Sequence, residues 1–567
     1  MKKLFILVLT VMMSVSMVAC AKTPSETAIY TAGTYEATEF GMNGDVVVTA
    51  EFSESKILSV TATGELETAG LGDKALEELS KVVVEKQSAE VDVVSGATVS
   101  STAMLKALQN CIDQAKGIAT NDDTATVGDM SADVVVVGGG AAGLSAAIEA
   151  AAAGSEVILI EKQGNLGGST NFSAGAIVRN ATEDEAAASG ALNGEKLVDY
   201  FTEVAEGNAD RDFIETIIAQ SNDTFSWLKD MGYESNYMDY EGCFGEILSV
   251  EWGVGGTQLI SVLNNKAVEL GVEIVLNTAA TELILTDGSV TGVKAVNEGN
   301  EITIEAGSVV LATGSYIYDA ELVAEHTALG SVLTMMGGPG NTGDGLKMAE
   351  VVDAKTTFKG PGLLSSWSTV SQTISYVPSA YFVAVDMNGQ RFINEVEFYS
   401  IFANEAIKQN IAMFWIVYDS TTVSHDMLNI VEEGCMLQAD TLEELAGLMG
   451  VDAEALKTTI DDYNKLCEGK EDTQYGKPEK YLEKVETGPY YALMSLPVAI
   501  GTFGGLSIDE NAQVLDANNA PIANLFAAGE VANADFFGEV YPISGSCLTY
   551  ATTTGRIAGK AAATNAK

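Results

Sequence analysis

The sequence predicts an α/β protein in which a small α+β domain precedes a Rossmann-like domain that carries an inserted α+β domain. Three observations support this fold class. Four valines at 134–137 lead through a glycine-rich turn into an alanine-rich run, as in a βαβ unit. Residues 30–117 show their own pattern of short strands and helices. The pattern changes again between residues 356 and 495, in a chain long enough for several domains.

The N-terminal residues 1–19 have the features of a secretory signal peptide, with two lysines before an apolar run. The segment Met17-Val18-Ala19-Cys20, with a small residue before the cysteine, resembles the lipobox of bacterial lipoproteins. Met17 stands in place of the usual leucine. This resemblance implies cleavage before Cys20 and a lipid on its thiol; a plain signal peptide with an incidental cysteine is the alternative. Residues 20–29 would then be a tether. We therefore expect an extracytoplasmic protein that is lipid-anchored to the bacterial cell membrane.

Residues 30–117 are expected to fold as a small domain of strands and helices. β-Branched residues at 46–50 and 57–61 predict two strands. Periodic apolar residues at 74–81 and 102–114 predict two helices.

A short motif lies between these two helices. The segment Asp92-Val93-Val94-Ser95-Gly96-Ala97-Thr98 resembles the flavinylation motif D-x-x-S/T-G-A-T of FMN-binding domains in sodium-pumping and Rnf-type redox complexes. The segment 67–72 resembles the glycine-containing loop of the same FMN-binding domain family. The resemblance implies that FMN is attached covalently to the Thr98 hydroxyl through a phosphoester bond. Ser95, Gly96 and Ala97 would then also contact the FMN. Without the family, the motif is a helix-entry turn with an N-cap residue.

Residues 118–130 are small, polar and aperiodic, which predicts a linker. Beyond it, residues 131–355 and 496–567 are expected to form the nucleotide-binding domain, and residues 356–495 the insertion. The insertion contains a strand-like segment at 381–385 and helices at 442–449 and 453–467.

The turn after the valines carries glycines at G-x-G-x-x-G spacing. Gly138 permits a tight turn, Gly140 lets the backbone approach a pyrophosphate, and Gly143 lets helix and strand pack closely. A second strand, 156–160, ends in Glu161, which is placed to accept a hydrogen bond from a ribose hydroxyl. The pattern indicates dinucleotide binding, and a purely structural glycine turn is the alternative.

Further motifs extend this pattern toward the C-terminus. They are the glycine-rich loop 164–171, the strand and A-T-G turn at 309–314, Gly343-Asp344-Gly345 at a helix start, and the strand and glycine–acid turn at 525–531. Together they resemble the FAD-binding fold shared by fumarate reductase and succinate dehydrogenase flavoprotein subunits, urocanate reductase and 3-ketosteroid dehydrogenases.

This resemblance spans residues 131–567 and implies a non-covalently bound FAD. A nicotinamide dinucleotide is the competing occupant, but the additional loops serve the isoalloxazine end of a flavin. Residues 356–495 would be the cap over the flavin, with the active site at the seam. The residues that would hold FAD are Gly138, Gly140, Ala142, Gly143, Glu161, Gly168, Ser169, Thr170, Asp344 and Glu530.

Composition excludes several other classes of function. The formal net charge of -49 argues against nucleic acid or an anionic membrane surface as a partner. Six cysteines without a C-x-x-C pair, and only two histidines, argue against a metal site. Apart from the signal peptide, the sequence contains no apolar run long enough to span a membrane.

The expected substrate site departs from that of the acid reductases. Tyr399 stands where fumarate and urocanate reductases have a catalytic arginine, and 501–505 lacks their histidine before the glycine pair. Residues 539–546 lack their substrate-binding arginine. Because a dicarboxylate needs paired cations to offset its desolvation, fumarate is a poor candidate.

The same positions resemble those of the ketosteroid dehydrogenases. Asn394-Glu395 followed by Tyr399 fits their cap motif, although Phe398 replaces a common proline, and Tyr541-Pro-x-x-Gly545 fits their carbonyl-binding motif. The resemblance implies that the Tyr541 hydroxyl and the Gly545 N–H hold a ketone oxygen while Tyr399 handles the proton on the adjacent carbon. Such donors form an oxyanion hole for an enolate.

We therefore expect an extracytoplasmic flavin-dependent ene reductase. Electrons would pass from a membrane or extracellular donor to the FMN, to FAD, and as hydride to the C=C bond of an α,β-unsaturated carbonyl compound, with steroid-like enones among the candidates. Three alternatives remain open. They are the reverse, ketosteroid-type dehydrogenase; a urocanate- or fumarate-type acid reductase that uses Arg179 or Arg211; and a flavin-binding electron-carrier lipoprotein without catalysis.

Overall fold

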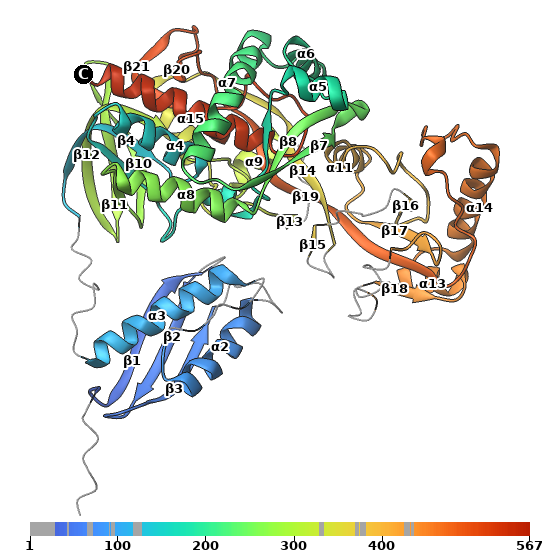
Figure 1. Cartoon of the computed structure of the whole chain (residues 1–567), viewed down its shortest axis with the longest axis horizontal. Helices are drawn as coiled ribbons and strands as arrows, with labels where there is room; N and C mark the ends of the chain where they lie inside the picture. The colour runs from blue at the N-terminus through green and yellow to red at the C-terminus, as the bar shows by residue number, and fades with distance from the viewer. Residues whose placement is uncertain are drawn as a thin grey trace, which may run out of the picture. The chain divides into compact units, whose positions relative to one another are not determined.

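The computed structural model describes residues 29–41, 45–64, 72–89, 91, 94, 97–116, 127–327, 334–368, 373–374, 381–424, 431 and 436–567. The chain divides into two compact units, Met1–Thr126 and Val127–Lys567, which are treated separately below (Figure 1). The predicted signal peptide, Cys20, Ser95, Gly96 and most of the predicted linker lie outside the described residues, as does the side chain of Thr98.

The first unit is a three-stranded antiparallel sheet with two helices. The sheet runs β1 (Gly33–Phe40), β2 (Asp45–Phe52) and β3 (Ile57–Thr63), and the helices are α2 (Gly72–Lys86) and α3 (Thr98–Lys116). Alternate residues of β2 are buried in one core with both helices, as expected for a half-buried strand. The two predicted strands and two predicted helices are confirmed, and β1 was missed.

The second unit is built on a mostly parallel sheet. Strands β21 (Pro521–Ala527), β12 (Asn300–Leu311), β4 (Met130–Val137), β5 (Val157–Ile160) and β9 (Glu273–Val275) lie side by side in parallel. β10 (Thr278–Thr286) and β11 (Ser289–Asn297) extend this sheet as antiparallel strands beyond β12. The valines of β4 are buried because parallel strands are covered on both faces. The Rossmann-like fold predicted from the sequence is confirmed.

Helices α4 (Ala141–Ala152) and α15 (Ser546–Asn565) lie directly against each other on this sheet (Figure 1). Two glycines of α15 permit the contact: a Cβ on Gly555 would stand 2.3 Å from the Ala142 carbonyl oxygen, and one on Gly559 2.2 Å from that of Ala146. The helix that follows the dinucleotide turn is therefore packed against the C-terminal helix of the chain.

Two long strands connect this sheet domain with the insertion. β14 (Thr356–Ser368) and β19 (Tyr490–Leu506) pair antiparallel, and the first part of β19 also pairs antiparallel with β17 (Phe414–Asp419). The insertion further contains β16 (Val383–Asp386), α11 (Tyr399–Lys408), α13 (Leu442–Met449) and α14 (Ala453–Gly469). The predicted strand and the two predicted helices of the insertion are confirmed, whereas the long strands were not foreseen.

A separate three-stranded sheet was also missed. It consists of β6 (Ile177–Arg179), β8 (Ile247–Gly253) and β7 (Ser235–Glu241), in that order. The remaining elements are α5 (Glu183–Ser189), α6 (Glu195–Val204), α7 (Arg211–Asp230), α8 (Gly256–Glu269), α9 (Ala320–His326), α10 (Asp344–Ala349), β13 (Thr334–Met335), β15 (Thr373–Ile374), β18 (Leu437–Ala439), β20 (Gln513–Leu515) and short 3-10 turns.

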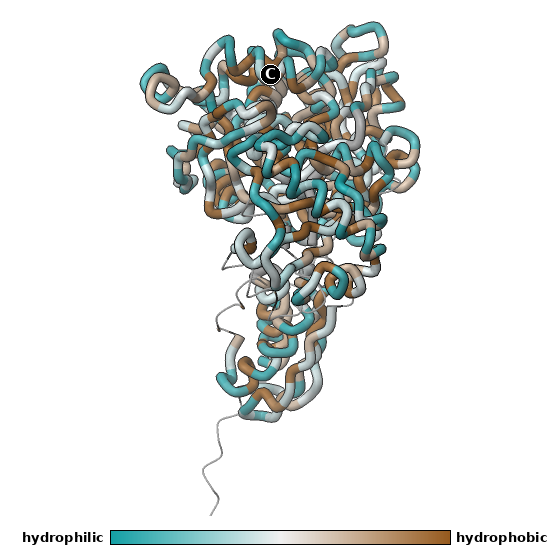
Figure 2. The backbone as a smooth tube through the Cα atoms, turned by 90° about the vertical axis from the view of Figure 1, so that its right-hand side faces the viewer, coloured by the Kyte–Doolittle hydropathy of each residue, from teal (hydrophilic) through white to brown (hydrophobic). Residues whose placement is uncertain are grey.

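Many of the outer loops are hydrophilic, as the teal segments in Figure 2 show, in keeping with the acidic composition. Among the described residues, no helix has both the length and the apolar character that a membrane span requires.

Candidate active site

The dinucleotide turn has the conformation that its glycines predict. Gly138 has φ +110°, and a Cβ there would stand 2.3 Å from the Ala312 carbonyl oxygen. A Cβ on Gly143 would stand 1.9 Å from the Gly138 carbonyl oxygen. Both positions therefore require glycine for the packing of the chain itself.

Gly140 differs, because its surroundings are open. A Cβ there would meet only the Gly167 carbonyl oxygen, at 3.7 Å. Gly140 caps the N-terminus of α4 without a side-chain hydrogen bond, at the positive end of the helix dipole. Open space next to a helix N-terminus suits the pyrophosphate of a dinucleotide.

Glu161 lies at the end of β5, next to this turn. Its Oε2 accepts a hydrogen bond from the Gly139 N–H at 2.7 Å, and its Oε1 accepts one from the Gln163 N–H at 2.8 Å. Burial raises the pKa of the carboxyl group. Each carboxylate oxygen can accept a second hydrogen bond, so a ribose hydroxyl fits at this position.

The second glycine-rich loop, 164–171, runs into a short 3-10 helix, Gly168–Phe172, that holds two neighbouring segments together. The Ser169 hydroxyl accepts hydrogen bonds from the Gly338 N–H (3.1 Å) and the Asn341 side-chain amide (2.5 Å). The Thr170 hydroxyl accepts one from the Ala141 N–H at 3.3 Å, in the first turn of α4. The loop is therefore fixed next to the helix N-terminus.

Asp344 begins α10 and is ion-paired with Lys162 at 2.7 Å. It also accepts a hydrogen bond from the Thr342 hydroxyl at 2.8 Å. Because Lys162 directly follows Glu161, Asp344 lies toward the ribose side of the site. Lys162 balances its negative charge.

Glu530 follows β21, and its side chain lies next to Gly501 of β19. A Cβ on Gly501 would stand 1.8 Å from its Oε1, and burial raises the pKa of Glu530 to about 8. Two buried hydroxyls after β12, those of Thr313 and Ser315, lack a hydrogen-bond partner in the described part of the chain. Buried hydroxyls rarely stay unpaired, so the residues along this edge fit a polar cofactor such as FAD.

The two predicted catalytic tyrosines meet at the seam between the insertion and the sheet domain. Tyr399 begins α11, and its ring centroid lies 6.3 Å from that of Tyr541. The Tyr399 hydroxyl is 3.1 Å from the Ser544 hydroxyl. The Ser400 hydroxyl donates to the Tyr541 carbonyl oxygen at 2.8 Å, which ties α11 to this segment. Burial raises the pKa of Tyr399, so its phenol keeps its proton.

Tyr541 folds back onto the start of α15. Its hydroxyl oxygen accepts hydrogen bonds from the N–H groups of Gly545 (3.0 Å) and Cys547 (3.2 Å). The predicted arrangement had the Gly545 N–H and the Tyr541 hydroxyl side by side on a substrate oxygen. In this structure the amide is instead bound to the phenol, because Gly545, with φ +99°, turns its N–H toward Tyr541.

No arginine lies at these tyrosines. The chain has four arginines, and carboxylates of the chain bind all of them. Arg179 pairs with Glu185 (2.6 Å) and Glu251 (3.1 Å), Arg211 with Asp199 (2.6 Å), Arg391 with Glu395 (2.7 Å) and Asp472 (2.6 Å), and Arg556 with Glu149 (2.7 Å). The two arginines considered for an acid substrate, Arg179 and Arg211, are thus already neutralised.

Aromatic side chains surround Tyr541 on its other side. Phe503, directly before the glycine pair 504–505, stacks on Phe537 at 4.6 Å and lies 6.2 Å from Tyr541, measured between ring centroids. Ser544, which faces Tyr399, was not singled out from the sequence. Its position inside the Tyr541-Pro-x-x-Gly545 motif was the only signal available.

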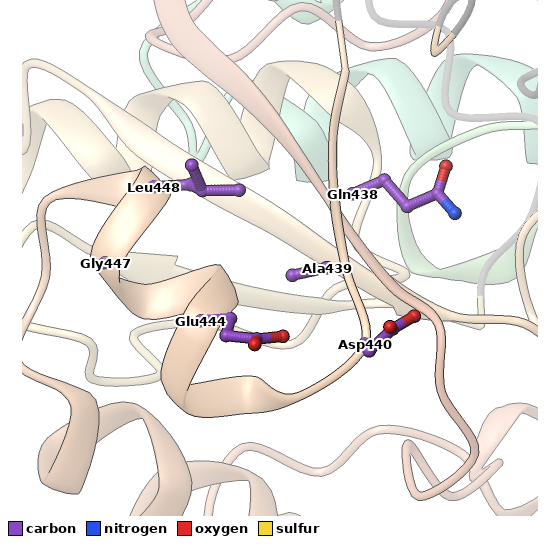
Figure 3. A pocket seen from close by; sticks show the side chains of 6 residues that line it. All are labelled: Gln438, Ala439, Asp440, Glu444, Gly447 and Leu448. Atoms are coloured by element: carbon purple, nitrogen blue, oxygen red, sulfur yellow. The ribbon is translucent and has the colours of Figure 1, made fainter.

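Other parts of the chain do not add to the site. The pocket in Figure 3 lies between β18 and α13 and is lined by Gln438, Ala439, Asp440, Glu444, Gly447 and Leu448, none of them a predicted site residue. The described residues contain no group of side chains able to hold a metal ion. In the first unit, Ala97 is buried and precedes α3, whose first residue is Thr98.

Comparisons with known proteins agree with this architecture. The family of FAD binding domains matches residues 133–548, and the FMN-binding domain family matches residues 41–113. The chain belongs to the FAD binding domain family, as an FAD-dependent oxidoreductase of the class that acts on CH–CH groups. An FMN-binding domain precedes this unit in the sequence.

Three relatives have known functions. Vinyl phenol reductase of Lactiplantibacillus plantarum is 30% identical, over 76% of this chain and 96% of that protein. Urocanate reductase of Eggerthella lenta is 29% identical, over 93% of this chain and 92% of that protein. NADH:acrylate oxidoreductase of Vibrio harveyi is 29% identical over 94% of this chain, which spans 61% of that longer protein.

Solved structures show the same fold. The open conformation of a flavocytochrome c3 fumarate reductase superposes with a TM-score of 0.65 at 25% identity, covering 84% of this chain and 85% of the other. The 3-ketosteroid-delta4-(5alpha)-dehydrogenase of Rhodococcus jostii RHA1 gives a TM-score of 0.63 at 24% identity, covering 78% and 99%.

Proposed function

We propose that this protein reduces the C=C bond of an uncharged α,β-unsaturated carbonyl compound. Tyr399 donates the proton, and the Tyr541 hydroxyl, which the Gly545 N–H holds in place, binds the carbonyl oxygen. The observation that carries the proposal is the seam itself, where two protonated phenols meet and every arginine of the chain is bound elsewhere. Such a site suits a neutral substrate oxygen.

FAD, when bound, supplies the hydride. Negative charge then develops on the carbonyl oxygen, and a donor aimed at that oxygen is worth about 3–4 kcal/mol in comparable enzymes. Tyr541 is suited to this role because its two oxygen lone pairs are occupied by the N–H groups of Gly545 and Cys547. In the proposed complex the Tyr541 hydroxyl donates its own proton to the substrate oxygen, and the amides at the helix N-terminus strengthen it as a donor.

The proton for the α-carbon comes from Tyr399. Burial keeps this phenol protonated, and the Ser544 hydroxyl fixes its direction. A phenol is a suitable general acid because it is neutral before transfer and lies within hydrogen-bond reach of the seam.

An acid reductase is the second candidate, favoured by the full-length match to urocanate reductase. It would need a cation released from one of the arginine ion pairs described above. The reverse reaction, desaturation of a ketone, uses the same side chains and differs only in the electron acceptor.

The test is a panel of unsaturated ketones and acids with reduced methyl viologen as donor, applied to the FAD-loaded full chain. Tyr541→Phe is expected to lower kcat/KM for an enone by about 100- to 1000-fold with unchanged FAD content. Tyr399→Phe should also lose most enone turnover.

Tyr381→Phe, which changes an exposed tyrosine of the insertion, serves as the matched control. Enone reduction that survives both tyrosine variants would refute the proposal, and urocanate or fumarate reduction that survives them would favour the acid reductase.

We also propose that the first unit carries FMN covalently on Thr98, and that Cys20 carries a lipid that holds the protein on the outer side of the cell membrane. The FMN-binding family match supports the first point. The lipobox-like sequence supports the second. Metabolic labelling with a fatty acid, lost in Cys20→Ser, would test the anchor.

A further inference from the structure

The turn between β7 and β8 exposes a phenylalanine close to the seam. Phe244 is 62% exposed and has φ 62° and ψ 12°, in the left-handed region. A bulky residue rarely adopts this conformation, and an exposed phenyl group gains little from folding. Neither feature is explained by the stability of the turn.

The residues on both sides of Phe244 fix its position. The Cys243 N–H donates to the Tyr200 hydroxyl at 2.9 Å, and the Cys243 thiol lies 3.4 Å from the Pro542 carbonyl oxygen and 3.7 Å from that of Tyr541. The Tyr200 hydroxyl donates to the Pro542 carbonyl oxygen at 2.6 Å. The residue before Phe244 is therefore attached to the backbone of Tyr541.

The same hairpin also reaches the other phenol and the insertion. Besides burial, the nearby Tyr240 of β7 raises the pKa of Tyr399. Glu241, at the end of β7, lies close enough to Lys480 of the insertion to raise the pKa of that lysine, after the larger effect of Tyr481. The turn thus stands beside the seam, between Tyr541, Tyr399 and the insertion.

From this placement we infer that Phe244 is a specificity-determining residue. Its ring covers the flat apolar body of a substrate whose carbonyl oxygen is bound by Tyr541. The substrate class is then an enone conjugated to, or contained in, a ring system, and not a short acyclic enone. Contact with such a ring removes the phenyl group from water and adds an aromatic contact. The inference rests on the proposed function and narrows its substrate class.

Phe244→Gly tests this because glycine tolerates φ 62° without strain. We expect the FAD-loaded full chain to keep its thermal stability. With reduced methyl viologen as donor, KM for 4-phenyl-3-buten-2-one should rise by about tenfold or more, as loss of an aromatic contact and apolar burial predicts. KM for 3-penten-2-one and kcat for both ketones should stay unchanged. Phe244→Tyr should restore the wild-type KM for the phenyl ketone.

Met238→Ala is the matched control, because Met238 is exposed on the same hairpin (47%). It should change neither KM. An unchanged ratio of the two KM values in Phe244→Gly would overturn this inference alone. If both KM values rise equally, the role of Phe244 is merely structural. A wild-type enzyme that reduces neither ketone would overturn the proposed function and this inference with it.

Discussion

At the scale of single residues, Tyr541 illustrates how backbone amides can direct a side chain. Its oxygen accepts hydrogen bonds from two N–H groups at the start of α15, and these fix the position of the phenol. Phenylalanine at this position would remove that donor and leave two amides without an acceptor, at a cost of about 1–3 kcal/mol for each buried group. Loss of activity in Tyr541→Phe should therefore be read together with its thermal stability.

Glu530 makes the stability of the flavin-free protein depend on pH. Burial raises the pKa of its carboxyl group to about 8, from about 4.5 in the unfolded chain. Between these values the folded chain binds a proton that the unfolded chain lacks, so stability falls as pH rises from 5 to 8. The slope is at most about 1.4 kcal/mol per pH unit. Urea unfolding at several pH values should show this slope in the wild type and a smaller one in Glu530→Gln. Parallel curves would contradict the prediction.

The positions of Gly138, Gly143 and Glu161 could be read from the sequence because turn, strand and helix follow one another within thirty residues. The bond from the Gly545 N–H to Tyr541 could not, since it depends on how residues 541–545 fold back onto α15. Ser544 was missed for a different reason: its partner Tyr399 lies 145 residues away in the chain.

At the scale of elements, the start of α11 depends on a buried charge cluster. Arg391, Glu395, Asp472 and Lys477 have side chains at most 1% exposed, and Arg391 binds both carboxylates. Although burial opposes ionisation, hydrogen bonds from Arg391 and from backbone N–H groups lower the pKa of Asp472 to about 2. Glu395 precedes Tyr399 by four residues, so this cluster anchors the segment that presents the phenol.

We therefore predict that Asp472→Asn destabilises the insertion. Breaking a buried ion pair costs about 3–5 kcal/mol, because the cluster is left with more positive than negative charge. Thermal unfolding should begin at a lower temperature, and kcat should fall as Tyr399 loses its fixed position. Asp461→Asn, which removes an exposed pair with Lys457, should leave both unchanged. Equal behaviour of the two variants would contradict this role.

The strands that were missed share a physical cause. β14 and β19 pair across more than a hundred residues, and β19 contains proline and glycine that weaken a local strand signal. β7 is mostly exposed and polar, so it lacks an alternating apolar pattern. These strands form because of long-range pairing, which a local pattern does not reveal.

At the scale of the whole molecule, the chain combines two flavin-binding units, and each can be tested on its own. Thr98→Ala is expected to lose flavin fluorescence from the denatured protein on a gel, because no hydroxyl remains for a phosphoester bond. FAD content and turnover with reduced methyl viologen should persist, since the catalytic unit has its own core. Thr61→Ala, exposed on β3, is the matched control. Covalent flavin that persists in Thr98→Ala would place the attachment elsewhere.

The four neutralised arginines also have a consequence for substrate capture in solutions of different ionic strength. A chain with net charge -49 repels anions, and added electrolyte screens that repulsion over about 10 Å at 0.1 M. An anionic alkene would therefore bind more tightly as sodium chloride rises from about 20 to about 300 mM, whereas an uncharged ketone would bind equally well throughout. The dependence of KM on salt thus distinguishes capture of an anionic alkene from capture of an uncharged ketone.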